Sequence, residues 1–70
     1  MMPLGMAGVG DVNVIAKITG RDEVRQHLAE LGFVVGAEVR VVSEMAGSLI
    51  LSVGDSRVAL NRDMAMRIMV

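Results

Sequence analysis

The sequence contains no cysteine, and His27 is its only histidine. Disulfides and cysteine-based zinc sites, which stabilise many small domains, are therefore excluded. With 70 residues, of which 53% are hydrophobic, the chain depends on its apolar core for stability. Residues 1–70 are expected to form one domain, and a sheet closed into a barrel would bury such a core economically.

Aromatic residues and excess positive charge are also scarce. Phe33 is the only aromatic residue, which argues against an aromatic-lined groove for proline-rich peptides and against a stacking platform for single-stranded nucleic acid. Seven basic residues stand against eight acidic ones, so there is no basic field to attract phosphates or anionic lipids. We expect no nucleic-acid partner.

No apolar run approaches the length needed to span a bilayer, and the first residues lack the pattern of a signal peptide. The sequence predicts a cytoplasmic protein without direct membrane insertion. The serines lie on predicted strands and turns without a nucleophile motif around them, whereas His27 lies on a predicted helix. We therefore expect a protein that is not an enzyme.

The first half of the chain contains one predicted strand and one predicted helix. Residues 1–10 are expected to be a lead-in segment, with Leu4 fixed to the core and regular structure beginning at Asp11. Dense β-branched residues predict a strand over 12–18, either bulged or buried on both faces. Apolar residues at helical spacing predict a short helix over 22–31 that ends at a glycine. The apolar stripe of this helix consists of Val24, Leu28 and Leu31.

The second half predicts a series of short strands separated by glycine turns. Asn61 is expected to cap a single helical turn before the last strand. Four strands are predicted over residues 38–44, 49–53, 57–60 and 66–70. The whole chain is therefore mostly β with one short helix, and it is expected to form a small, partly open β-barrel of the SH3-like or OB type.

One set of side chains could bind a metal weakly. Glu23, His27 and Glu30 are spaced i, i+4 and i+7, which places them along one edge of the predicted helix. Imidazole and carboxylate are suitable ligands for ferrous iron. A lone histidine with flexible carboxylates binds metals weakly, so we expect no cofactor and at most weak ferrous iron binding here.

A set of glycine and apolar positions is distributed in a distinctive order over the whole chain. These positions are Pro3-Leu4, Gly10, Leu28-x-x-Leu31-Gly32-Phe33-x-x-Gly36, Val39-x-Val41, residues 49–54, Leu60 and Ala65-x-x-Ile68-x-Val70. Their order and spacing resemble the FeoA family. The resemblance implies an SH3-like barrel that serves in the cytosol as an accessory to FeoB, the membrane transporter of ferrous iron. Two departures concern proline: the family often has one at the position of Val35 and commonly one in the loop of residues 45–49.

The predicted partner is the cytosolic domain of a FeoB-type membrane iron transporter. The predicted contact surface combines residues 32–36 with the turn of residues 45–49. Self-association through an exposed strand edge stays an open possibility. The alternative function is an iron-responsive regulatory or metal-sensing module similar to the C-terminal domain of diphtheria-toxin-repressor-type regulators. The predicted partner-binding residues are Gly32, Phe33, Gly36, Met45, Leu49 and Arg57.

Overall fold

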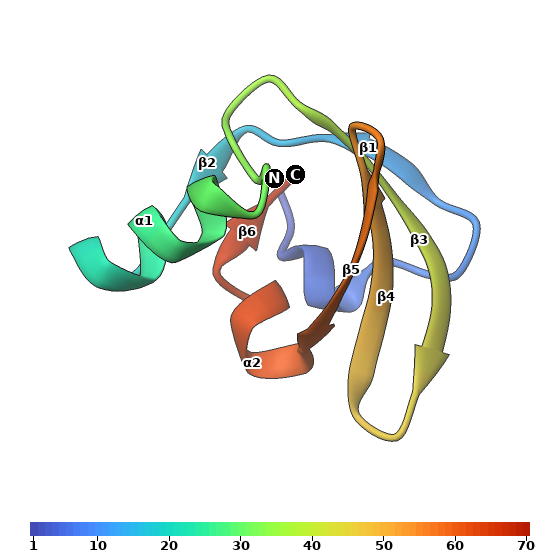
Figure 1. Ribbon diagram of the computed structural model, residues 1–70. Coiled ribbons are helices and arrows are strands. Elements are labelled where there is room, and N and C mark those ends of the chain that lie inside the picture. The colour runs from blue at the N-terminus through green and yellow to red at the C-terminus, as the bar shows by residue number, and fades with distance from the viewer.

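The computed structural model describes all 70 residues and forms two antiparallel sheets that wrap around one apolar core (Figure 1). The larger sheet has the strand order β1-β3-β4-β5, and the smaller one pairs β2 with β6. The strands are β1 (Val12–Val14), β2 (Lys17–Ile18), β3 (Glu38–Met45), β4 (Ser48–Val53), β5 (Ser56–Asn61) and β6 (Ile68–Met69). The helices are the 3-10 turn η1 (Leu4–Met6), α1 (Asp22–Glu30) and α2 (Arg62–Ala65). The predicted mostly β architecture is confirmed.

The core is filled from both sheets, α1, α2 and η1, and the buried residues of β3 and β4 alternate with residues that are exposed or of intermediate burial over most of each strand. Phe33 is its largest side chain and is fully buried, and no polar or charged side chain is buried with it. This apolar interior matches the composition from which the barrel was predicted. The buried hydrophobic residues are Leu4, Ala7, Ile15, Leu28, Phe33, Val39, Val41, Leu49, Leu51, Val53, Leu60, Ala65 and Ile68.

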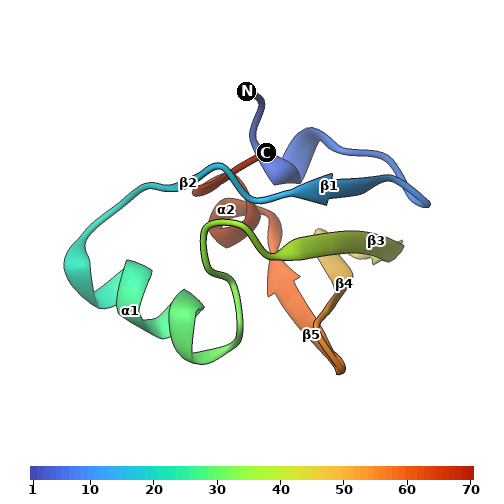
Figure 2. The ribbon, with the colours of Figure 1, turned by 90° about the horizontal axis from the view of Figure 1, so that it is seen from above.

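The segment predicted as one strand over residues 12–18 is split into β1 and β2. Ile15 is buried between them, and its N–H donates to the carbonyl of Ala37. The next N–H, that of Ala16, donates instead to the carbonyl of Met69. The chain therefore leaves the large sheet and joins the small one within two residues, as Figure 2 shows from above. This change of sheet is the corner that closes the barrel.

The lead-in segment is more ordered than predicted, because regular structure begins at Pro3 and not at Asp11. Met2 and Val70 exchange two backbone hydrogen bonds of 2.8 Å, and Pro3 forms a β-bridge with Met69. Leu4 is fully buried, which confirms that it is fixed to the core. The two ends of the chain consequently lie side by side (Figure 1).

The side chain of Arg62, the first residue of α2, joins α2 to η1 and β3. Its Nη1 donates to the carbonyl of Gly5 in η1, and its Nη2 lies 2.7 Å from Oε1 of Glu44 in β3. The predicted cap on α2 is confirmed, since Oδ1 of Asn61 accepts from the N–H of Met64 at 2.8 Å. The region where the N-terminal segment and η1 meet β6 and α2 is called the seam below.

Candidate functional site

The segment of residues 32–36, between α1 and β3, is fixed by the way in which α1 ends. Gly32 follows the helix with φ +103° and donates its N–H to Ala29, while the N–H of Phe33 donates to Leu28. This pair of bonds is the Schellman motif, in which the residue after the glycine packs on the helix residue five positions earlier. Phe33 and Leu28 are both fully buried, as this motif requires.

The burial of Phe33 corrects its predicted role as a partner contact, because a side chain with no exposed surface cannot contact another protein. Leu49 is also fully buried and is corrected in the same way. Both residues instead stabilise the surface residues beside them. The signal was present in the sequence, since the Schellman motif pairs a hydrophobic residue after glycine with the helix interior.

The apolar surface of this segment comes from Val34 and Val35, which lie between Phe33 and Gly36. They are 47% and 65% exposed. The N–H of Ala37 donates to the carbonyl of Val34 at 3.0 Å, and Gly36 has φ +92°, so residues 34–37 form a type II turn. The turn presents two valines to solvent on a backbone held at both ends.

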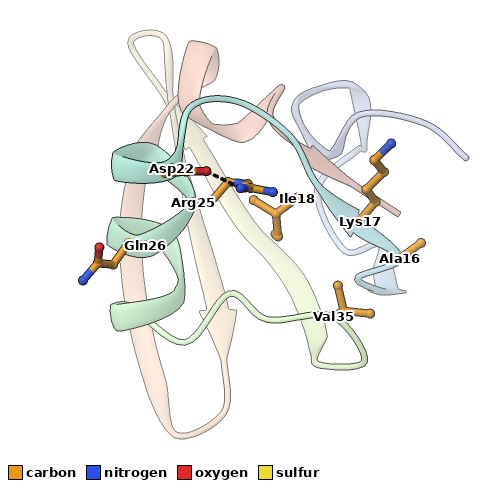
Figure 3. Close-up of a pocket in the computed structure, with 7 residues that line it drawn as sticks. All are labelled: Ala16, Lys17, Ile18, Asp22, Arg25, Gln26 and Val35. Carbon is orange, nitrogen blue, oxygen red and sulfur yellow. Dashed lines mark hydrogen bonds and ion pairs between the residues drawn. The ribbon is translucent and has the colours of Figure 1, made fainter.

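A shallow hollow of about 660 Å³ lies between α1 and β2, with Val35 on its wall (Figure 3). Arg25 and Asp22 form an ion pair inside it, and Ile18 lies beside them. The mixture of one ion pair, one lysine and small apolar side chains suits a surface contact with a partner. The lining residues are Ala16, Lys17, Ile18, Asp22, Arg25, Gln26 and Val35.

The turn at residues 46–47, which was predicted to share one surface with residues 32–36, lies at the opposite end of β3. β3 is eight residues long, which corresponds to about 23 Å between its ends. Figure 1 shows the two loops at the top and bottom of the sheet. Met45 is 65% exposed but cannot join the surface formed by Val34 and Val35.

Arg57, which was predicted to belong to the same surface, is the second residue of β5. A Cβ atom on Gly32 would lie 3.5 Å from Val53, and Val53 pairs with Ser56 at the start of β5. Arg57 is the next residue and is exposed. We use the term open end for the end of the barrel that contains residues 32–36, the hollow and the start of β5.

The three residues considered as metal ligands are all exposed on α1. No three or more His, Asp or Glu side chains in the chain are close enough together to hold a metal ion. Glu23 and Glu30 are seven residues apart, which is about 10 Å along a helix axis, so one ion cannot reach both together with His27. The structure therefore does not assemble the predicted ligand set.

Comparison with known proteins places this architecture in a family. The model of the FeoA domain matches residues 2–70. The chain belongs to the FeoA family. It is 33% identical to a Methanocaldococcus jannaschii protein assigned as Fe(2+) transport protein A, over 100% of this chain and 85% of that protein.

Solved structures of FeoA proteins confirm the SH3-like barrel. A crystal structure of an iron uptake regulatory protein, FeoA, superposes with a TM-score of 0.88 and 36% identity, covering 96% of this chain and 89% of that one. The zinc complex of FeoA from Stenotrophomonas maltophilia, described as an SH3 domain protein, superposes with a TM-score of 0.86 and 31% identity over 99% and 88% of the two chains.

The same fold occurs in a manganese-dependent transcriptional repressor, with a TM-score of 0.85. The identity is 23%, and the match covers 94% of this chain and 38% of the repressor. This similarity extends to the fold alone. Within the FeoA-family chain itself, no helix has both the length and the apolar character needed to cross a membrane.

Proposed function

We propose that this FeoA-family protein is a non-enzymatic accessory of ferrous iron uptake that binds the cytosolic part of a FeoB-type transporter. Family membership and the similarity to an Fe(2+) transport protein support the role in iron transport. The observation that supports docking is the open end, where Val34 and Val35 are exposed on a turn braced by the buried Phe33.

The physical basis of docking is the release of water from this apolar surface. Burying exposed valine side chains contributes about 25 cal/mol for each Å² of apolar area removed from water. Because the turn is held by the Schellman motif on one side and by the Ala37 bond on the other, little conformational entropy is lost when it binds. A rigid apolar turn beside a hollow with charged side chains is suited to a protein partner.

The test is calorimetric titration of the purified protein with the cytosolic domain of the FeoB-type transporter from the same organism. Val35→Glu places a charge in the contact, and we expect it to weaken binding by about tenfold or more. Met45→Glu is the matched control, because Met45 has the same 65% exposure but lies at the other end of the sheet. It should bind as the unmodified protein does.

Two results would overturn the proposal. If the unmodified protein shows no binding at concentrations up to about 1 mM, the FeoB-type transporter is not its partner. If Val35→Glu and Met45→Glu weaken binding equally, the open end is not the docking surface.

A further inference from the structure

Strand β5 is an edge strand whose outer side carries no neighbour. It is the last strand of the large sheet and is hydrogen bonded to β4 alone (Figure 1). β5 is six residues long, twice the length of β1 at the opposite edge. Unpaired edges of this length are templates for a further strand, and proteins generally shield them unless they are used.

The pairing with β4 determines which backbone groups of β5 are free. Ser48 and Asn61 are directly opposite, and the N–H of Arg62 donates to the carbonyl of Gly47 just beyond them. That bond identifies Ser48–Asn61 as a non-hydrogen-bonded pair. Hydrogen-bonded and non-hydrogen-bonded pairs alternate along the two strands, so the pairs that contain Leu60 and Val58 are hydrogen-bonded and those that contain Ala59 and Arg57 are not. The N–H and C=O groups of Arg57 and Ala59 therefore point away from β4 and have no partner in the chain.

Three cross-strand neighbours form a row on the outer face of the sheet that ends at β5, and two of them are arginines. Arg40 lies opposite Ser52, and Ser52 lies opposite Arg57, so the three share the outer face of the sheet. The chain has two ion pairs, Arg25–Asp22 and Arg62–Glu44, and neither involves Arg40 or Arg57. A shallow hollow of about 400 Å³ beside the row is lined by Ala37, Glu38, Arg40, Ser52 and Gly54.

We propose that β5 is the docking edge, and that the partner adds an extended acidic segment to it as a fifth strand. The residue of that segment opposite Arg57 would become the next member of the row on the outer face. Because the free groups of Arg57 would bond to it, its Cα would lie about 5.5 Å from the Cα of Arg57. An aspartate or glutamate there would pair with Arg57, while the free groups of Arg57 and Ala59 would provide main-chain hydrogen bonds.

A second copy of this chain is a poorer occupant than a partner with acidic residues. The edge strands β1 and β5 contain no aspartate or glutamate, so neither can place a carboxylate opposite Arg57 of another copy. The proposal rests on the proposed function, because the acidic segment is assigned to the transporter. β5 begins at the open end, so the added strand would start beside residues 32–36.

The first test removes the outward N–H of Ala59 and leaves the β4 ladder intact. Ala59→Pro does this, because proline is accepted on an edge strand where its nitrogen faces solvent. In titrations with the transporter's cytosolic domain we expect binding to weaken by about tenfold or more. Val12→Pro in β1 is the matched control at the other edge of the sheet. The bond from the Ile15 N–H to Ala37 makes Val14–Glu38 a non-hydrogen-bonded pair, and so is Val12–Arg40 two residues away. The N–H of Val12 therefore points away from β3. Val12→Pro should change binding by less than about twofold.

The second test reverses the charge at Arg57. Arg57→Glu should weaken binding by about tenfold, and Arg57→Lys by about threefold or less, because the charge is kept. Arg67→Glu, an equal change of charge at another exposed arginine, should have little effect. Circular dichroism verifies the fold of each variant. If Ala59→Pro does not fold, the Arg57 variants alone test whether the partner docks at β5.

The outcomes separate this inference from the proposed function. If the unmodified protein binds and folded Ala59→Pro and Arg57→Glu bind equally well, the docking edge is wrong and the proposed function stands. If the unmodified protein does not bind, the proposed function fails and the inference fails with it. If sedimentation shows a homodimer that Ala59→Pro dissociates, the edge belongs to a second copy and the acidic partner is wrong.

Discussion

Strands β6 and β5 differ in how completely their backbone edges are used. Met69 of β6 pairs with Lys17 of β2 and also forms a bridge with Pro3, so both sides of this strand are occupied. β5 pairs only with β4. The seam around β6 thus uses its hydrogen bonds to hold the ends of the chain together, whereas β5 leaves its bonds available to another molecule. We therefore expect β6 to contribute mainly to stability and β5 to contribute to recognition.

The largest expected effect concerns the core beneath the open end. Phe33→Ala should lower the free energy of unfolding by about 3–5 kcal/mol, because it leaves a cavity where the largest buried side chain was. Chemical denaturation measures this loss. Val34→Ala, at the exposed neighbouring position, should change stability by less than about 0.5 kcal/mol. Similar costs for the two would mean that Phe33 is not the brace of this turn.

At the seam, Arg62→Ala should cost about 1.5–3 kcal/mol, because it removes a charge-assisted hydrogen bond to the carbonyl of Gly5. Glu44→Ala should cost about 1 kcal/mol or less, since the ion pair between Arg62 and Glu44 is solvent exposed and worth little. Denaturation of both variants compares them. Equal costs would indicate that the ion pair, and not the bond to η1, carries the effect. Neither variant should alter docking.

Packing inside the seam predicts a smaller cost for Gly5→Ala. An added Cβ would lie 2.7 Å from Sδ of Met66 and 3.0 Å from its Cγ, so the Met66 side chain must shift. We expect a loss of about 1–2 kcal/mol in thermal or chemical unfolding. The double variant Gly5→Ala/Met66→Ala should recover part of it. A cost unchanged by the second substitution would place the strain elsewhere.

The smallest effect is a stabilisation at the open end. Val35 is the second residue of a type II turn, a position that proline favours, and its N–H makes no backbone hydrogen bond. Val35→Pro should raise the free energy of unfolding by about 0.4–1 kcal/mol, mainly by restricting the unfolded chain. A loss of stability would show that the backbone at Val35 does not fit proline.

The elements that the sequence predicts well have strong local signals. The stripe of Val24, Leu28 and Leu31, the glycine at position 32 and the cap at Asn61 each act within one or two turns, and the structure has the helices where these signals place them. The strands of the two hairpins agree to within one residue for the same reason. The split at Ile15 was not predictable, because it depends on which sheet each residue joins.

The candidate site was predicted less well, because partner surfaces depend on tertiary neighbours. Met45 and Gly32 both lie next to turns in the sequence, but they are close to opposite ends of β3 in the structure. Arg40 was missed as a site residue, since its role comes from Ser52 and Arg57 on other strands. The alternation Val39-Arg40-Val41 directs Arg40 away from the two valines, but no local pattern indicates that two arginines share one row.

Amide hydrogen exchange of β5, with and without the transporter's cytosolic domain, tests the central claim most directly. In the free protein the amides of Arg57 and Ala59 should exchange rapidly, while those of Val58 and Leu60, which face β4, should be protected. Saturating partner should slow the exchange of Arg57 and Ala59 by about tenfold or more and leave Val12 of β1 unchanged. Rapid exchange of Arg57 and Ala59 in the saturated complex would contradict strand addition at this edge.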